Sequence, residues 1–208
     1  MKDQKLVIIF LILLFVVVFS TWFFSSRNKE IKNYPYSFDG PIVAFGDSLV
    51  VGVGSENAGG FVGLLSEKIG EPIINEGRSG DTTISAIQRV DDVLEKDPKM
   101  VILLLGGNDY LRRIPKEKTF ENLGKMIEVF QENGAVVVVL GVRGGLLKDS
   151  YDSDFEDLSE KYQTLYVSNV LLGLLGKNEY MSDEIHPNDE GYKLIAGRVY
   201  EAVHDYIR

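Results

Sequence analysis

Short apolar runs alternate with longer amphipathic segments over most of this 208-residue chain. The apolar runs predict five strands, at residues 41–45, 72–75, 100–105, 135–140 and 165–167. Residues 101–105 and 136–140 contain only Val, Ile and Leu and do not alternate in polarity, so both faces of these strands should be buried. Burial on both faces is typical of a parallel sheet that is covered by helices.

Helical periodicity fills the segments between the predicted strands. Four segments place apolar side chains three or four residues apart, which gives each helix one face for the core. These faces consist of Phe61, Leu64, Leu65 and Ile69; Ile84, Ile87, Val90 and Leu94; Leu123, Met126, Ile127 and Phe130; and Leu194, Ile195, Val199 and Val203. Alternating strands and helices predict an α/β fold in one domain over residues 40–208, a three-layer α/β/α sandwich with a mostly parallel five-stranded sheet.

The amino terminus has a different pattern. Residues 6–24 carry no charged side chain, and nineteen helical residues span about 28 Å, close to the roughly 30 Å of a hydrocarbon core. We therefore expect one transmembrane helix over residues 6–24. The run is longer than the about 7–15 apolar residues of a cleaved signal peptide, which favours an uncleaved signal anchor over secretion.

Flanking charges indicate the orientation of this helix. Lys2 and Lys5 precede it and favour a cytoplasmic amino terminus at residues 1–5, against the charge of Arg27 and Lys29 on the far side. Residues 25–39 show neither the periodicity of a strand nor that of a helix, which predicts a linker. The domain is thus expected outside the cytoplasm, anchored to the membrane, or secreted if the segment is cleaved.

Composition narrows the classes of function. The net charge of −9 and the lack of a basic stripe in the sequence argue against a non-specific nucleic-acid surface. The chain has no cysteine, which excludes disulfides, thiol nucleophiles and cysteine metal sites. Its two histidines are too few for a typical metal-dependent hydrolase.

Four short motifs follow one another along the domain: GDSL at residues 46–49, GRSG at 77–80, GGND at 106–109 and DEIHP at 183–187. Acyl transfer through a serine needs a hydroxyl, an imidazole base, a carboxylate that orients the base, and donors for the oxyanion. Ser48, His186 and Asp183 match the first three requirements. The backbone N–H groups of Ser48 and Gly80 and the side-chain amide of Asn108 match the last.

These motifs resemble the blocks of the SGNH (GDSL) hydrolase family, whose Ser, Gly, Asn and His fall at Ser48, Gly80, Asn108 and His186. The resemblance runs from residue 41 to the carboxyl terminus and is greatest for the thioesterase I, lysophospholipase and arylesterase branch. It implies a flavodoxin-like SGNH hydrolase fold, and the family's Asp-x-x-His pairing supports Asp183 as the partner of His186. A serine mechanism of this kind requires no metal and no organic cofactor.

Other polar residues near the motifs have simpler expected roles. Asp47, Asp81 and Asp109 should bond to backbone groups of their own turns or cap the helix that starts near Thr82. The Arg112–Arg113 pair is expected to be solvated, with phosphate binding at the substrate entrance as the alternative. His204 lies in the last amphipathic segment without a motif, which predicts a surface or packing role.

The sequence lacks the motifs that nucleotide binding and calcium binding require. A dinucleotide fingerprint that includes Gly54 needs a glycine three residues later, where Asn57 stands, and the chain has no P-loop. An EF-hand loop that begins at Asp152 has Asp157 where the turn requires glycine and Gln163 where a bidentate glutamate is needed. Neither nucleotide nor calcium binding is therefore expected.

The sequence as a whole predicts a membrane-anchored serine esterase outside the cytoplasm. Its expected substrates are lysophospholipids, aryl esters or other short-to-medium acyl esters, with thioesters as a further candidate. An O-acetyl esterase of cell-envelope glycans and a non-catalytic envelope binding protein are the alternatives. Residues 141–147 replace the apolar, proline-containing loop expected of this branch, which leaves the acyl-chain length open, as the oligomeric state also is.

Overall fold

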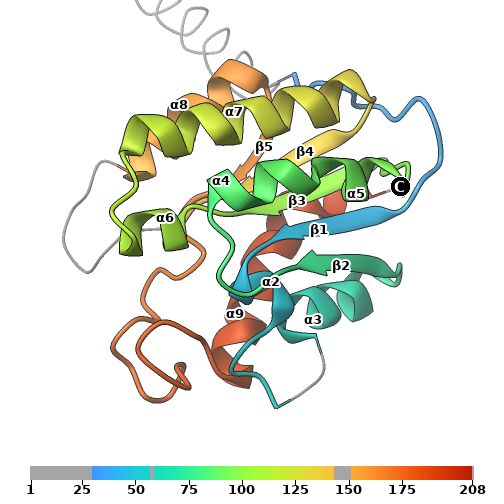
Figure 1. The fold of residues 1–208 in the computed structure, drawn as a ribbon. Coiled ribbons are helices and arrows are strands. Elements are labelled where there is room, and N and C mark those ends of the chain that lie inside the picture. The colour runs from blue at the N-terminus through green and yellow to red at the C-terminus, as the bar shows by residue number, and fades with distance from the viewer. Residues whose placement is uncertain (1–29, 57–58, 143–150, 208) are drawn as a thin grey trace, which may run out of the picture. The chain divides into compact units, whose positions relative to one another are not determined.

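The computed structural model describes residues 30–56, 59–142 and 151–207. Its strands are β1 (Ile42–Gly46), β2 (Ile73–Gly77), β3 (Met100–Leu104), β4 (Val136–Leu140) and β5 (Leu165–Val167). They form one sheet in the order β2-β1-β3-β4-β5, and every neighbouring pair is parallel (Figure 1). The predicted five-stranded parallel sheet is confirmed.

Helices cover both faces of this sheet. Their bounds are α2 Ser48–Val51, α3 Gly60–Ile69, α4 Thr83–Ala86, η1 Ile87–Arg89, α5 Val90–Leu94, α6 Gly107–Leu111, α7 Lys116–Glu132, α8 Tyr151–Tyr162, α9 Asp189–Val203 and η2 His204–Tyr206. In Figure 1, α4, α5, α7 and α8 lie on one face of the sheet, whereas α3 and α9 lie side by side on the other. The three-layer α/β/α sandwich is therefore confirmed.

The strand order creates a topological switch point at the carboxyl edge of the sheet. β1 pairs with β2 on one side and with β3 on the other, so the chain first winds outward to β2 and then crosses β1 to reach β3. In open α/β sheets, ligands bind beyond the carboxyl ends of the strands at such a switch point. The loops that follow β1, β2 and β3 are thereby brought together.

The core follows the hydrophobic pattern of the sequence. β1, β3 and β4 are buried at every position, whereas the edge strand β2 is only partly buried because it has one neighbour. The predicted face of α7 is completely buried at Leu123, Met126, Ile127 and Phe130. α9 buries Ile195, Val199 and Val203 as expected, but Leu194 is exposed.

The segment of residues 83–94 differs from the single amphipathic helix that the sequence predicts. It is broken into α4, the 3-10 turn η1 and α5. Ile84, a predicted core residue, is 47% exposed, whereas Thr83 is completely buried in its place. The buried face of this segment is rotated because the backbone N–H of Thr83 donates to the buried Asp109. The helix is interrupted at Arg89, whose side chain turns inward and pairs with Asp81.

Residues 31–39, which the sequence assigns to the linker, pack against the domain at the amino ends of the strands. The side chain of Asn33 donates to the carbonyl of Ala135, immediately before β4, at 3.0 Å. The backbone N–H of Lys32 donates to the carbonyl of Gln163, shortly before β5, at 3.0 Å. Individual contacts of this kind produce no hydrophobic periodicity, which explains why the sequence did not reveal them.

The compact unit therefore begins at Ile31, upstream of the predicted boundary at Gly40. The expected transmembrane helix at residues 6–24, the cytoplasmic residues 1–5 and the first part of the linker lie outside the described residues. In the ranges that are described, no helix combines the length and apolar character needed to cross a membrane. Membrane attachment stays an expectation from the sequence.

Candidate active site

Ser48 lies where the chain leaves β1 and begins α2. The preceding Gly46 allows the chain to pass close to β3, since a Cβ atom at this position would collide with the carbonyl oxygen of Leu104. Asp47 then caps α2, and its Oδ1 accepts the backbone N–H of Leu49 at 3.0 Å. These neighbours hold Ser48 at the carboxyl edge of the sheet.

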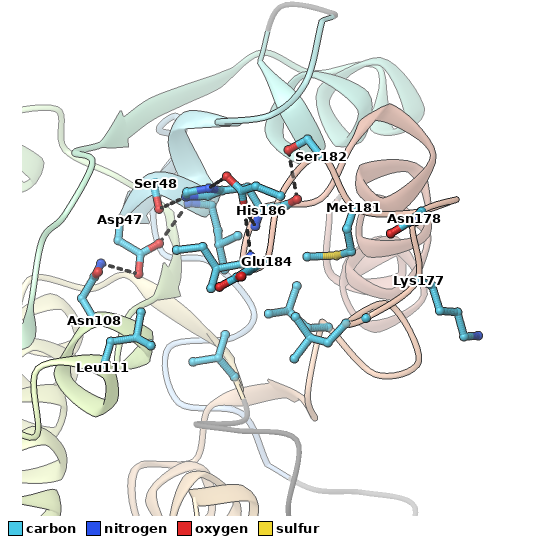
Figure 2. Close-up of a pocket in the computed structure, with 18 residues that line it drawn as sticks. Asp47, Ser48, Asn108, Leu111, Lys177, Asn178, Met181, Ser182, Glu184 and His186 are labelled. Carbon is cyan, nitrogen blue, oxygen red and sulfur yellow. Dashed lines mark hydrogen bonds and ion pairs between the residues drawn. The ribbon is translucent and has the colours of Figure 1, made fainter.

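His186 approaches Ser48 from the loop before α9. Its Nε2 lies 3.0 Å from Ser48 Oγ, and its Nδ1 lies 2.7 Å from Asp183 Oδ2 (Figure 2). A tight turn fixes this arrangement, because Asp183 Oδ1 accepts the backbone N–H groups of Ile185 at 2.8 Å and of His186 at 2.7 Å. With its proton on Nδ1, the imidazole presents an acceptor to the Ser48 hydroxyl.

The Asp183 carboxylate is stabilised by this turn. Desolvation acts to raise its pKa, but the hydrogen bonds from the His186 ring and from two backbone N–H groups outweigh it and hold the pKa below the ordinary value of an aspartate. Its side chain is 53% exposed, so solvent screens the charge. Asp183 is thus ionised at neutral pH and favours the tautomer with hydrogen on Nδ1.

Gly80 and Asn108 follow β2 and β3 at the same edge of the sheet. Gly80 has φ +81°, in the left-handed region that favours glycine. Asn108 is the second residue of α6, and its side-chain nitrogen donates to the carbonyl oxygen of Asp81 at 2.9 Å and to Asp47 Oδ2 at 3.3 Å. The structure thus brings all the predicted site residues to one edge, while their catalytic roles remain predictions.

A groove of about 600 Å³ opens beside Ser48 and His186 (Figure 2). Around these two residues the lining is polar and includes Asp47, Asn108 and Asp183. Elsewhere the wall is largely apolar and consists of Leu111, Val142, Leu171, Leu175, Met181 and Ile185. A groove with one polar end and one apolar wall suits an ester whose acyl chain lies along that wall.

Residues 169–181 supply much of this wall, a role that no sequence pattern indicates. The segment is built of turns held by single contacts: the Val170 N–H donates to the carbonyl of Gly141 at 2.9 Å. The guanidinium of Arg198 donates to the carbonyls of Val170 and Leu172. Without a regular repeat, its apolar residues are indistinguishable in sequence from ordinary core residues.

The three aspartates of the motifs are buried. The prediction is confirmed for Asp47, which caps α2, and for Asp109, which bonds to the first turn of the helix after Thr82, but not for Asp81, whose carboxylate bonds to the side chains of Ser85 and Arg89. Asp81 forms an ion pair with Arg89 at 2.6 Å, and Asp109 Oδ2 accepts the backbone N–H of Thr83 at 2.8 Å. Asp47 is 3% exposed, and burial is the main cause that raises its pKa to about 6. The Asp47 carboxylate is therefore protonated more readily than an ordinary aspartate.

The structure also shows the surroundings of Arg112 and His204. Arg112 is exposed but not merely solvated, because its Nη2 donates to the carbonyl of Gly80 at 2.9 Å. His204 stacks on Tyr200, with ring centroids 5.2 Å apart, and thus has the packing role that was predicted. Within the described ranges, no group of three or more His, Asp or Glu side chains is placed to hold a metal ion.

Comparisons with known proteins identify relatives of this chain in sequence and in structure. The model of the "GDSL-like Lipase/Acylhydrolase family" matches residues 44–194. An arylesterase of Vibrio mimicus is 30% identical over 167 residues, which cover 74% of this chain and 84% of the relative. Esterase TesA of Pseudomonas aeruginosa is 28% identical over 158 residues, 70% of this chain and 79% of the relative. The psychrotrophic esterase EstA of Pseudoalteromonas sp. matches with a TM-score of 0.72 at 28% identity, over 81% of this chain and 99% of that structure.

Proposed function

Since the chain belongs to the GDSL-like lipase/acylhydrolase family and is a carboxylic ester hydrolase, we propose that it cleaves acyl esters with a triad of Ser48, His186 and Asp183. One observation carries the proposal. A continuous set of contacts runs from Asp183 Oδ2 through both nitrogens of His186 to Ser48 Oγ, at 2.7 and 3.0 Å. A base that is itself oriented by a carboxylate activates a serine hydroxyl.

In the proposed reaction, Ser48 Oγ attacks the carbonyl carbon while His186 Nε2 takes the hydroxyl proton. The carbonyl electron pair moves to oxygen, and this oxyanion accepts hydrogen bonds from the backbone N–H groups of Ser48 and Gly80 and from the Asn108 amide. The pair then returns, the bond to the leaving alcohol breaks, and His186 protonates that alcohol. Water, deprotonated by His186, attacks the acyl-serine and releases the acid and free Ser48.

The proposed substrates are aryl esters, lysophospholipids and other short-to-medium acyl esters, with thioesters as a further candidate. The apolar wall formed by Leu171, Leu175 and Met181 supports an acyl group longer than acetyl, because each buried methylene contributes about 0.8 kcal/mol. The name of the Vibrio mimicus relative, arylesterase, supports aryl esters in particular.

We further propose that residues 6–24 anchor the chain and that the domain lies outside the cytoplasm. The support is the uncharged run of membrane-spanning length, preceded by Lys2 and Lys5. Acyl-CoA is cytoplasmic, so the location favours lysolipids or acylated envelope polymers as substrates. Two measurements test this arrangement. The full chain should stay in the membrane during alkaline extraction, and protease added outside intact cells should digest the domain.

A series of p-nitrophenyl esters from two to sixteen carbons, given to the full chain in a mild detergent, tests the activity. We expect faster turnover of butyrate and longer esters than of acetate, and loss of turnover in Ser48→Ala. A strict preference for two carbons, together with release of acetate from an O-acetylated glycan, would favour the O-acetyl esterase instead. A folded chain without Ser48-dependent turnover would favour the non-catalytic binding protein.

A further inference from the structure

A single buried guanidinium, that of Arg89, joins the segments that carry the proposed oxyanion donors. Its Nη2 donates to the carbonyl of Gly46 and its Nη1 to the carbonyl of Glu76, both at 2.9 Å. These carbonyls lie at the ends of β1 and β2. Its Nε donates to Asp81 Oδ2 at 2.6 Å, in the loop that follows β2.

A buried arginine is unusual at the end of a short helical turn such as η1. Arg89 is 5% exposed, and its guanidinium lies 4.3 Å from the centroid of the Phe45 ring. Burial of a charge is costly unless it is paired and hydrogen-bonded, and Asp81 with the two carbonyls meets that condition. The planar fork of an arginine can satisfy three acceptors in fixed directions, which the point charge of a lysine cannot do.

The link from Arg89 to the reaction runs through Asp81 and Asn108. The amide nitrogen of Asn108 has two N–H groups, and they donate to the Asp81 carbonyl at 2.9 Å and to Asp47 Oδ2 at 3.3 Å. An oxyanion needs one of these N–H groups. The longer contact is the weaker one, so the Asp81 carbonyl is the contact that must keep the amide oriented while the other N–H is released to the substrate.

We propose that Arg89 is a positioning residue of the oxyanion hole, which acts by fixing the Asp81 carbonyl that orients the Asn108 amide. The inference rests on the proposed function, because it assigns Arg89 a part in the same reaction. Displacement of the amide by 1 Å is enough to cost about 100-fold in rate. The apolar wall comes from other segments of the chain, so substrate binding should change little.

The first test is Arg89→Lys in the full chain, which keeps the charge and removes the fork. We expect kcat for p-nitrophenyl butyrate to fall about 100-fold and KM to change by less than about twofold. Gln131→Leu is the matched control, because Gln131 is also buried and donates to a main-chain carbonyl, that of Tyr162, at 2.6 Å. It lies at the amino edge of the sheet, so its loss should lower the melting temperature and leave kcat unchanged.

A double-mutant cycle separates positioning from general destabilisation. If Arg89 acts through Asn108, Arg89→Lys combined with Asn108→Ala should be about as slow as Asn108→Ala alone. Multiplied losses in the double variant, or a folded Arg89→Lys with wild-type kcat, would overturn the inference. Absence of ester hydrolysis in the wild type would instead overturn the proposed function.

Asp81→Asn tests the same link from its other end and does not depend on the folding of Arg89→Lys. The substitution keeps the main-chain carbonyl and the side-chain shape but removes the charge that pairs with Arg89. We expect a folded variant with kcat lowered about tenfold and the same non-additivity with Asn108→Ala. Unchanged kcat, or additive losses, would count against the inference.

Discussion

Because of the turn that holds Asp183, we expect the kcat of Asp183→Asn to be lower than that of Asp183→Ala. The position of Oδ1 receives two backbone N–H groups, at 2.8 and 2.7 Å, so only the carbonyl oxygen of an asparagine can occupy it. The amide NH2 must then take the place of Oδ2 and face His186 Nδ1. This makes Nδ1 an acceptor, places the ring proton on Nε2 and removes the acceptor that Ser48 needs.

The expected losses differ for a physical reason. A wrong tautomer in a serine triad costs about 10,000-fold in kcat, which is the loss we expect for Asp183→Asn. Alanine leaves the tautomer free, and it removes the carboxylate charge together with the acceptor of the Ile185 and His186 backbone N–H groups. The charge of Asp183 stabilises the protonated His186 ring. Two unit charges about 4 Å apart attract each other by about 1 kcal/mol in water and by about 4 kcal/mol near a protein surface, and loss of this attraction corresponds to a rate about 5-fold to 1,000-fold lower. Because the Asp183 side chain is 53% exposed, the loss for alanine should lie toward the lower end.

The assay is kcat for p-nitrophenyl butyrate at pH 8, with the melting temperature of each variant measured beside it. Both variants should stay folded, since the turn lies in an exposed loop. An Asp183→Asn enzyme as fast as Asp183→Ala, or faster, would refute the reasoning from the turn. It would mean that the carboxylate does not select the tautomer of His186.

Two other residues give predictions of a different kind. Asn108→Ala should lower kcat by about 100- to 1,000-fold with the fold intact, and a variant with unchanged kcat would remove Asn108 from the mechanism. Asp47 has its pKa raised by burial from 3.8 to about 6, so folding is favoured when it is protonated, and this advantage is lost as the pH rises through about 6. The free energy of unfolding of the wild type, relative to Asp47→Asn, should therefore increase by about 2 kcal/mol between pH 7 and pH 4, and urea titrations that show a constant difference would contradict this.

The parts of the fold that the sequence predicts are those with a regular repeat. β3 and β4 are continuous apolar runs because both of their faces are covered, and short runs of β-branched and leucine residues are typical of buried parallel strands. The meeting of the motifs at one edge of the sheet was predictable for a related reason. Parallel strands present their carboxyl ends at one edge, so short motifs after three strands had to meet there.

The parts that the sequence did not predict depend on single side chains. Thr83 replaces Ile84 in the core because a hydrogen bond to Asp109 compensates for burying its polar atom. Arg89 belongs to an apparently ordinary amphipathic segment, and its burial depends on three acceptors that lie far away in sequence or in the preceding loop. The groove wall at residues 169–181 likewise has no periodic signal.

The packing of residues 31–39 at the amino ends of the strands has a practical consequence. Ile31 and Ser48 lie at opposite edges of a sheet whose central strands are five residues long, about 17 Å. A bead, a surface or a fused partner that is joined directly at Ile31 is therefore attached at the edge remote from the groove. Substrates as bulky as a polymer or a micelle can then approach Ser48 from the free side of the immobilised enzyme.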